Sequence, residues 1–153
     1  KDLYRRRNKY EEKELKEFSI LFLAINNLDI FRKNIELVSD ITFLNKIMNE
    51  FKKKLIDYLL SEKFFERKKL EVEDFDQKFK DIINMININA PVKIICKNKS
   101  DKEIISIFNE IMNEIKKIEL QEKIQFLEDK VSSNLNENLY SELLSLRNQL
   151  KKG

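Results

Sequence analysis

The densest group of side chains that could do chemistry is a run of carboxylates in the middle of the chain. Its members are Glu71, Glu73, Asp74 and Asp76. Carboxylates hold a cation, or act as acid and base, when they converge on one point. These four point to different sides in either a helix or a loop, and nearby lysines neutralise their charge. The run is therefore predicted to mark a helix start, because acidic residues stabilise a first turn.

The other reactive groups are scarce. The sequence contains no histidine, which removes the commonest general base, the histidine-activated nucleophiles and histidine metal ligands. Its one cysteine, Cys96, follows Ile94 and Ile95, which predicts a small buried apolar residue and not a reactive thiol. The single glycine, at the terminus, leaves no glycine-rich phosphate loop. We therefore expect a chain that is not an enzyme and binds no metal or cofactor.

The composition predicts an all-helical protein. Hydrophobic residues make up 42% of the 153 residues, with one glycine and one proline, so hairpin turns are scarce. Charged residues are 37% of the chain but their sum is only +3, which is typical of a solvated exterior and not of a phosphate-binding surface. No apolar run is long enough to span a membrane. The chain begins at Lys1 without methionine or signal peptide, so we expect a piece of a larger cytoplasmic protein.

Helical spacing of apolar residues predicts the elements of a bundle over residues 17–119, preceded by a linker or exposed helix at 1–16. The first bundle helix carries Phe18, Leu21, Phe22 and Ile25 and ends at 26–27. A second is predicted to follow a cap at Ser39-Asp40 and to run through Phe43 and Leu44 to Leu59. A third is expected at 72–86. Residues 87–99 hold the sole proline and are expected to form a loop, with a brief strand at 92–96 left open.

A capping box, Ser100-Asp101-Lys102-Glu103, predicts the start of a long helix that runs to about Val131. The polar run 132–134 then turns the chain into a last helix that ends near Lys152. Antiparallel pairing of these two helices would give a helical hairpin.

The long helix does not keep one apolar face. Its first half is marked by Ile104, Phe108, Ile111, Ile115 and Ile118, and its second half by Leu120, Ile124, Leu127 and Val131. Because the step from Ile118 to Leu120 is two residues, the second stripe lies about 200° round the helix from the first. The first half is therefore expected to pack in the bundle and the second to pack elsewhere. The last helix offers the partner stripe: Leu135, Leu139, Leu143, Leu146 and Leu150. The fold expected is a helical bundle followed by a projecting hairpin over 120–153.

Residues off the hairpin stripes are candidates for partner binding. Phe126 lies about 100° from Leu127, and a flank of the last helix carries apolar and basic groups. These flank residues are Tyr140, Leu144, Arg147 and Lys151. Exposed aromatic, leucine and arginine side chains suit a protein-binding surface. Ordinary surface residues, or a hairpin folded back onto the bundle, would explain the same pattern.

The C-terminal third resembles the terminal hairpin of bacterial DNA primases. The similar segments are 120–124 (LQEKI) and 136–152 (NENLYSELLSLRNQLKK), which combine a Leu- and Glu-rich helix, a polar turn and a Leu-x-x-x-Leu-Lys-Lys-like tail. Upstream, 18–28 (FSILFLAINNL) resembles the first core helix of the same domain in alphaproteobacterial primases. That helix commonly ends in a Leu-Ile-Asn-His-Pro-like sequence, and here Asn27 and Leu28 replace the His-Pro pair.

This resemblance implies a helicase-binding C-terminal domain. Such a domain docks on the N-terminal domain of the hexameric replicative helicase, which recruits primase to the fork and couples priming to unwinding. The zinc-binding and polymerase domains of the primase would lie upstream, outside this chain. The resemblance implies contacts from the last two helices, including Asn148, Lys151 and Lys152, in the cytoplasm of a bacterium.

Two other functions fit the sequence. The N-terminal domain of the replicative helicase has a similar bundle and hairpin, but it should continue through a linker into an ATPase domain, whereas this chain ends at Lys-Lys-Gly, as expected of a protein's own C-terminus. A nucleic-acid-binding helical module would use Arg5–Arg7 and the scattered lysines, and its binding would depend strongly on salt.

Overall fold

The computed structural model describes residues 11–67, 70, 72–133 and 137–152. All elements in this part of the chain are helical, with no strand among them, which confirms the predicted all-α class. The chain divides into two compact units, Lys1–Phe108 and Asn109–Gly153. The division falls inside one helix and comes earlier than the boundary expected after residue 119.

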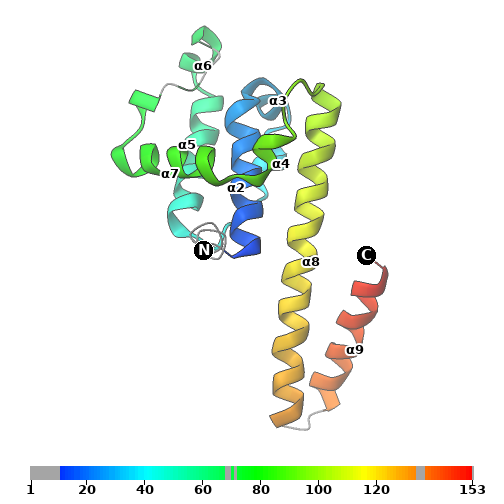
Figure 1. The fold of residues 1–153 in the computed structure, drawn as a ribbon. Helices are drawn as coiled ribbons and strands as arrows, with labels where there is room; N and C mark the ends of the chain where they lie inside the picture. Colours follow the sequence, from blue (N-terminus) through cyan, green and yellow to red (C-terminus); the bar gives the residue numbers. More distant parts are fainter. Residues whose placement is uncertain (1–10, 68–69, 71, 134–136, 153) are drawn as a thin grey trace, which may run out of the picture. The chain divides into compact units, whose positions relative to one another are not determined.

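Helix α2 (Glu12–Asn26) is the centre of the first unit (Figure 1). It packs against α3 (Leu28–Lys33), α7 (Gln77–Asn89) and the 3₁₀ turn η2 (Pro91–Ile94). The predicted stripe is buried except for Phe22, which is partly exposed, and Ile20, Leu23 and Ala24 on other sides of the helix are buried as well. A helix that is enclosed by neighbours buries more than one face, and a one-sided pattern does not reveal this.

The charged segment before the first stripe is partly helical. Residues 12–16 form the first turns of α2, and Lys13 within them is buried. Residues 12–16, expected to be a linker or an exposed helix, are therefore helical but partly buried. Residues 1–10, including Arg5–Arg7, lie outside the described part of the chain.

Helix α5 (Lys46–Leu59), which follows the short α4 (Ile35–Ser39), starts later than predicted. The predicted cap at Ser39-Asp40 is wrong, because Asn45 caps this helix. Its Oδ1 accepts hydrogen bonds from the amides of Ile47 (2.9 Å) and Met48 (3.3 Å). Phe43 precedes the helix and is buried, while its amide donates to Asn49 Oδ1 at 2.8 Å. Asparagine is a favourable capping residue because its side-chain oxygen accepts hydrogen bonds from first-turn amides that lack a partner within the helix.

An aromatic cluster joins α5 to the segment that follows it. Helix α6 (Glu62–Arg67) was not predicted, and the helix expected at 72–86 is a 3₁₀ turn η1 (Val72–Asp74) followed by α7, which begins at Gln77. The ring centroids of neighbours in the cluster are 5.9–6.5 Å apart. Its members are Phe51, Tyr58, Phe64, Phe75 and Phe79. Burial of these rings stabilises α6 and η1, which are too short to show a helical period in the sequence.

The segment expected as a loop contains η2. The strand left open at 92–96 does not form. Val92 in this turn is buried, and its amide donates to the Ser19 hydroxyl of α2 at 3.4 Å.

Helix α8 (Asp101–Ser133) starts and continues as predicted. The capping box is confirmed: the Glu103 amide donates to Ser100 Oγ, and the Ser100 amide donates to Glu103 Oε1, both at 3.3 Å. Within the first unit, the Phe108 ring lies 5.1 Å from the Phe31 ring, centroid to centroid, and both are buried. Farther along, Ile124 is buried on another side of the helix. One helix thus buries two different sides along its length, as the two-residue step predicts.

The second unit pairs the later part of α8 with α9 (Glu137–Lys152), drawn from yellow to red in Figure 1. Its core consists of Ile124, Leu127 and Leu143, and the flanking apolar residues pack on these three. The packed residues are Leu120, Val131, Leu139, Leu146 and Leu150. The predicted leucine seam is therefore confirmed, except for Leu135, which lies outside the described residues.

Candidate functional site

The leucine seam positions the candidate residues of the hairpin. Because the seam side chains point between α8 and α9, every residue about a quarter turn from them lies on a flank of the hairpin. Leu143 is buried in the seam, whereas its neighbour Leu144 is 42% exposed. The seam thus decides which side chains of α9 remain available to a partner.

One ion pair connects the two helices across this seam. Arg147 Nη2 of α9 lies 2.6 Å from Glu128 Oε1 of α8, and both side chains are partly exposed. An exposed pair of this kind contributes little to stability. The position of the pair is informative, because it identifies the flank of α9 that lies beside the Glu128 flank of α8.

Four of the predicted partner-binding residues share the Arg147 flank. Tyr140, Leu144, Arg147 and Lys151 follow one another at intervals of four, three and four residues. At about 100° per residue they fall within roughly 60° of helix circumference. We call these four residues the Tyr140 strip. Tyr140 is 50% exposed, so the strip presents apolar surface beside two cations.

Phe126 does not join the Tyr140 strip. It precedes Glu128 by two residues, so it lies about 200° round α8 from the flank that carries the ion pair. The Phe126 side chain is 59% exposed, and Lys130 Nζ lies 4.4 Å from the centre of its ring. The hairpin therefore has two separate apolar positions on opposite flanks, and one flat partner surface cannot cover both.

The remaining predicted partner residues point elsewhere on α9. Asn148 and Lys152 are exposed but lie about 80° and 120° round the helix from Tyr140. They border the strip without belonging to it.

The candidate residues of the first unit are the carboxylate run and Cys96. Of the carboxylate run, Glu71 lies outside the described residues, and Asp76 stands at the N-cap of α7. Cys96 is half-buried and not fully buried as predicted. Burial raises the pKa of its thiol above the ordinary value, against a smaller opposing effect of the Lys99 ammonium. A thiol with a raised pKa is a poor nucleophile at neutral pH.

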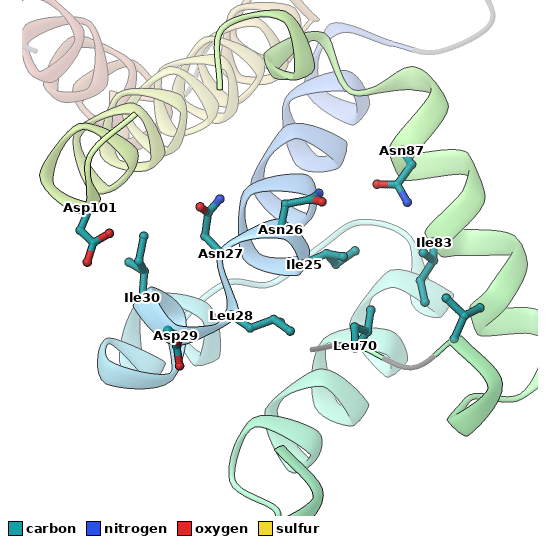
Figure 2. A pocket seen from close by; sticks show the side chains of 11 residues that line it. Ile25, Asn26, Asn27, Leu28, Asp29, Ile30, Leu70, Ile83, Asn87 and Asp101 are labelled. Carbon is teal, nitrogen blue, oxygen red and sulfur yellow. The ribbon is translucent and has the colours of Figure 1, made fainter. Parts of the chain in front are cut away.

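The first unit also contains a cavity of about 560 Å³ between the end of α2, the start of α3 and α7 (Figure 2). Apolar side chains such as Ile25 and Ile83 form part of its walls, and three asparagine amides and two aspartates supply the polar groups. These are Asn26, Asn27, Asn87, Asp29 and Asp101. Asn26 and Asn27 donate their Nδ2 groups to carbonyls one turn back in α2, each at 2.9 Å.

The chemistry of this cavity is limited. Among the described residues that line it there is no hydroxyl, thiol, lysine or arginine. Asp29 and Asp101 stand in the first turns of α3 and α8, where a negative charge stabilises the helix start. Their place in a first turn therefore accounts for both carboxylates, and the described lining of the cavity does not combine a nucleophile with a group that could activate it.

A groove opens in the second unit where α9 ends beside α8. Its volume is about 790 Å³, and its floor is formed by the last leucines of the seam, Leu120, Leu146 and Leu150. Lysines and glutamates both occur on its α8 wall. The wall residues are Glu110, Glu114, Lys116, Lys117, Glu119 and Lys123. The sequence pattern missed this groove, because it depends on where α9 stops relative to α8.

Glu128 is the other residue that the sequence analysis missed. The signal was available: pairing Ile124 with Leu146 in an antiparallel seam puts Glu128 and Arg147 on the same flank. Opposite charges at such positions attract each other across two helices.

Among the described residues, no group of acidic or sulfur side chains is arranged to hold a metal ion. No described helix has both the length and the apolar composition that crossing a bilayer requires. Comparisons of the chain with protein-family models, with curated proteins and with solved structures found no match.

Proposed function

We propose that this chain is the helicase-binding C-terminal domain of a bacterial DNA primase, and that the Tyr140 strip is its docking surface. In this proposal the domain has no catalytic role of its own. It recruits the upstream zinc-binding and polymerase domains to the replicative helicase in the cytoplasm. The hairpin, the order of the helices before it and the resemblance of its tail to primases support this assignment.

The docking role rests on one observation: Tyr140 and Leu144 are exposed, although the apolar seam beside them is already packed. α9 already buries Leu143 against α8, so these two side chains are not needed to hold the hairpin together. Tyrosine and arginine are the residues that most often dominate protein interfaces. An apolar centre flanked by charged groups is the usual arrangement of such a surface.

The test is direct binding to the N-terminal domain of the replicative helicase from the same genome, measured by calorimetry. We expect saturable binding by the full chain and none by a chain shortened at Glu119, which lacks α9 and the Glu128 segment. Far-ultraviolet circular dichroism checks that the shortened chain keeps the helices of the first unit. Retained affinity in that chain would exclude the hairpin as the docking element.

Two further measurements separate the alternative functions. A helicase N-terminal domain would associate with copies of itself, which sedimentation of the isolated chain detects. A nucleic-acid-binding module would bind single-stranded DNA with an affinity that falls steeply with salt. Either result, with no helicase binding, would replace the proposal.

A further inference from the structure

The Tyr140 strip carries information about its partner because its charge is not uniform. Apolar groups occupy its first half, and the cations Arg147 and Lys151 occupy its second half. Glu128, beside Arg147, already binds that side chain at 2.6 Å. The nearest α8 residues on the same flank are amides, Gln121 and Gln125, both exposed. The end of the strip is therefore a local positive region.

Arg147 keeps hydrogen-bonding capacity after its ion pair. The pair uses Nη2, whereas a guanidinium carries five N–H donors in a fixed fork. Glu128 holds the side chain in place, so a partner would not have to order it. A held arginine with free donors suits a carboxylate, to which it can bind through two parallel hydrogen bonds.

The hairpin unit as a whole is not positively charged. Residues 109–153 contain seven lysines and arginines against eight aspartates and glutamates, a net charge of −1. A nucleic acid needs an extended positive surface along its backbone. Isolated carboxylates on a protein partner need only the two cations, so the charge pattern favours a protein.

We infer that the Tyr140 strip binds an amphipathic helix of the partner, which runs antiparallel to α9. Its first turns carry carboxylates that face Lys151 and Arg147, and its later turns carry apolar side chains that cover Leu144 and Tyr140. The strip is a straight ridge with helical spacing, which packs into the groove between side-chain rows of another helix. Acidic residues in the first turns also stabilise the partner helix itself.

This inference rests on the proposed docking role but does not require the helicase as partner. Its probes are two synthetic peptides of about 18 residues, long enough to hold a helix. Both share one leucine ridge, and they differ in having glutamate or lysine in the first two turns. Each is titrated into the ¹⁵N-labelled full chain while the α9 amides are followed by nuclear magnetic resonance.

The decisive variant reverses the charges and keeps the internal ion pair. It combines Glu128→Arg, Arg147→Glu and Lys151→Glu. We expect the unmodified chain to bind the glutamate peptide about fivefold more tightly, as suits two exposed ion pairs, and the variant to prefer the lysine peptide by a similar factor. The resonance changes should centre on Tyr140 and Leu144 in both cases, with unchanged helicity.

Three results would overturn the inference: no change with either peptide at millimolar concentration, changes centred on Phe126, or a preference that does not reverse in the variant. Its failure is distinct from failure of the helicase assignment. If the charge reversal alters the peptide preference but the chain does not bind the helicase, the helicase assignment is wrong and the inference of an acidic partner helix stands. Helicase binding with an affinity that the charge reversal leaves unchanged would keep the helicase assignment and exclude the acidic partner helix.

Discussion

Arg147 and Glu128 are 19 residues apart in the chain and join α9 to α8 through a contact of 2.6 Å between Nη2 and Oε1. This contact puts the Tyr140 strip on the Glu128 flank of the hairpin. Phe126 consequently faces the other way. The two apolar positions that the sequence grouped as one surface can therefore be tested against each other.

Substitution on the strip should weaken helicase binding. Tyr140→Ala and Leu144→Asp each remove exposed apolar surface without touching the seam, so we expect at least a tenfold loss of affinity, about 1.4 kcal/mol. Phe126→Ala removes a comparable exposed ring from the opposite flank and should leave affinity unchanged. Calorimetry with the helicase N-terminal domain measures all three. Equal losses for Phe126 and Tyr140 would contradict the choice of flank.

Adjacent leucines should differ sharply in their effect on the hairpin. Leu143→Ala leaves a hole in the seam and should cost about 2–5 kcal/mol, enough to detach α9 from α8. Leu144→Ala, at the exposed neighbour, should change stability by no more than about 0.5 kcal/mol. Hydrogen exchange of the α9 amides reports both. Similar exchange rates in the two variants would mean that the seam does not hold α9.

The first unit should depend on the pair of tilted rings that joins α3 to the start of α8. Phe108→Ala removes a buried ring 5.1 Å from Phe31 and should lower the free energy of unfolding by about 3–5 kcal/mol. Ile94, which is 85% exposed, provides the control, because Ile94→Ala should stay within about 0.5 kcal/mol. Urea denaturation followed by circular dichroism makes the comparison. A small effect of Phe108→Ala would show that these rings are not part of the cooperative core.

The capping box should give α8 a pH-dependent start. The Ser100 amide, followed by the Ser100 hydroxyl, holds the pKa of Glu103 below its ordinary value, with Lys99 Nζ 3.6 Å away. A depressed pKa means that the stabilisation is present above the unfolded-state pKa and is lost as pH falls through the folded-state pKa. We expect the first turn of α8 to fray in acid. Ser100→Ala should raise the Glu103 pKa, and loss of the serine cap should destabilise the start of α8 by about 1 kcal/mol. Ser100→Thr should retain the cap.

Carbon-13 resonances of the Glu103 carboxyl, followed through an acid titration, measure that pKa in each variant. An unchanged midpoint in Ser100→Ala would show that the serine hydroxyl does not contribute to the shift.

Long periodic helices were predictable from the sequence because their signals are local. The helix from 101 to 133 needs only its capping box and an unbroken apolar spacing, and both are present in neighbouring residues. The seam of Ile124, Leu127 and Leu143 followed from the same spacing. The spacing within each helix repeats over one or two turns, so each stripe is visible in the sequence, although the two stripes meet only across the hairpin.

Short elements were not predictable because tertiary packing creates them. Nothing in the spacing of 62–67 indicates α6, which instead follows from burial of Phe64 against Tyr58, with ring centroids 6.1 Å apart. Likewise, Ser39 looked like a cap from its residue type. Asn45 caps α5 because the backbone at Phe43 is bound to the Asn49 side chain.

The candidate site was predictable as a set of exposed residues but not as a surface. Helical angles show that Tyr140 and Phe126 both avoid the seam. They do not show that the two lie on opposite flanks until the helices are paired in register. The Arg147–Glu128 contact supplies that register.

The single layer of apolar side chains between α8 and α9 has a consequence for the thermodynamics of recognition. With one apolar side chain per turn on each helix, α9 should spend a measurable fraction of time detached, and a ligand that touches only α9 would meet a partly melted target. A ligand that spans both helices would suppress this opening. Its association should then show a heat-capacity change larger than the contact area alone would give, because binding would complete the burial of the seam.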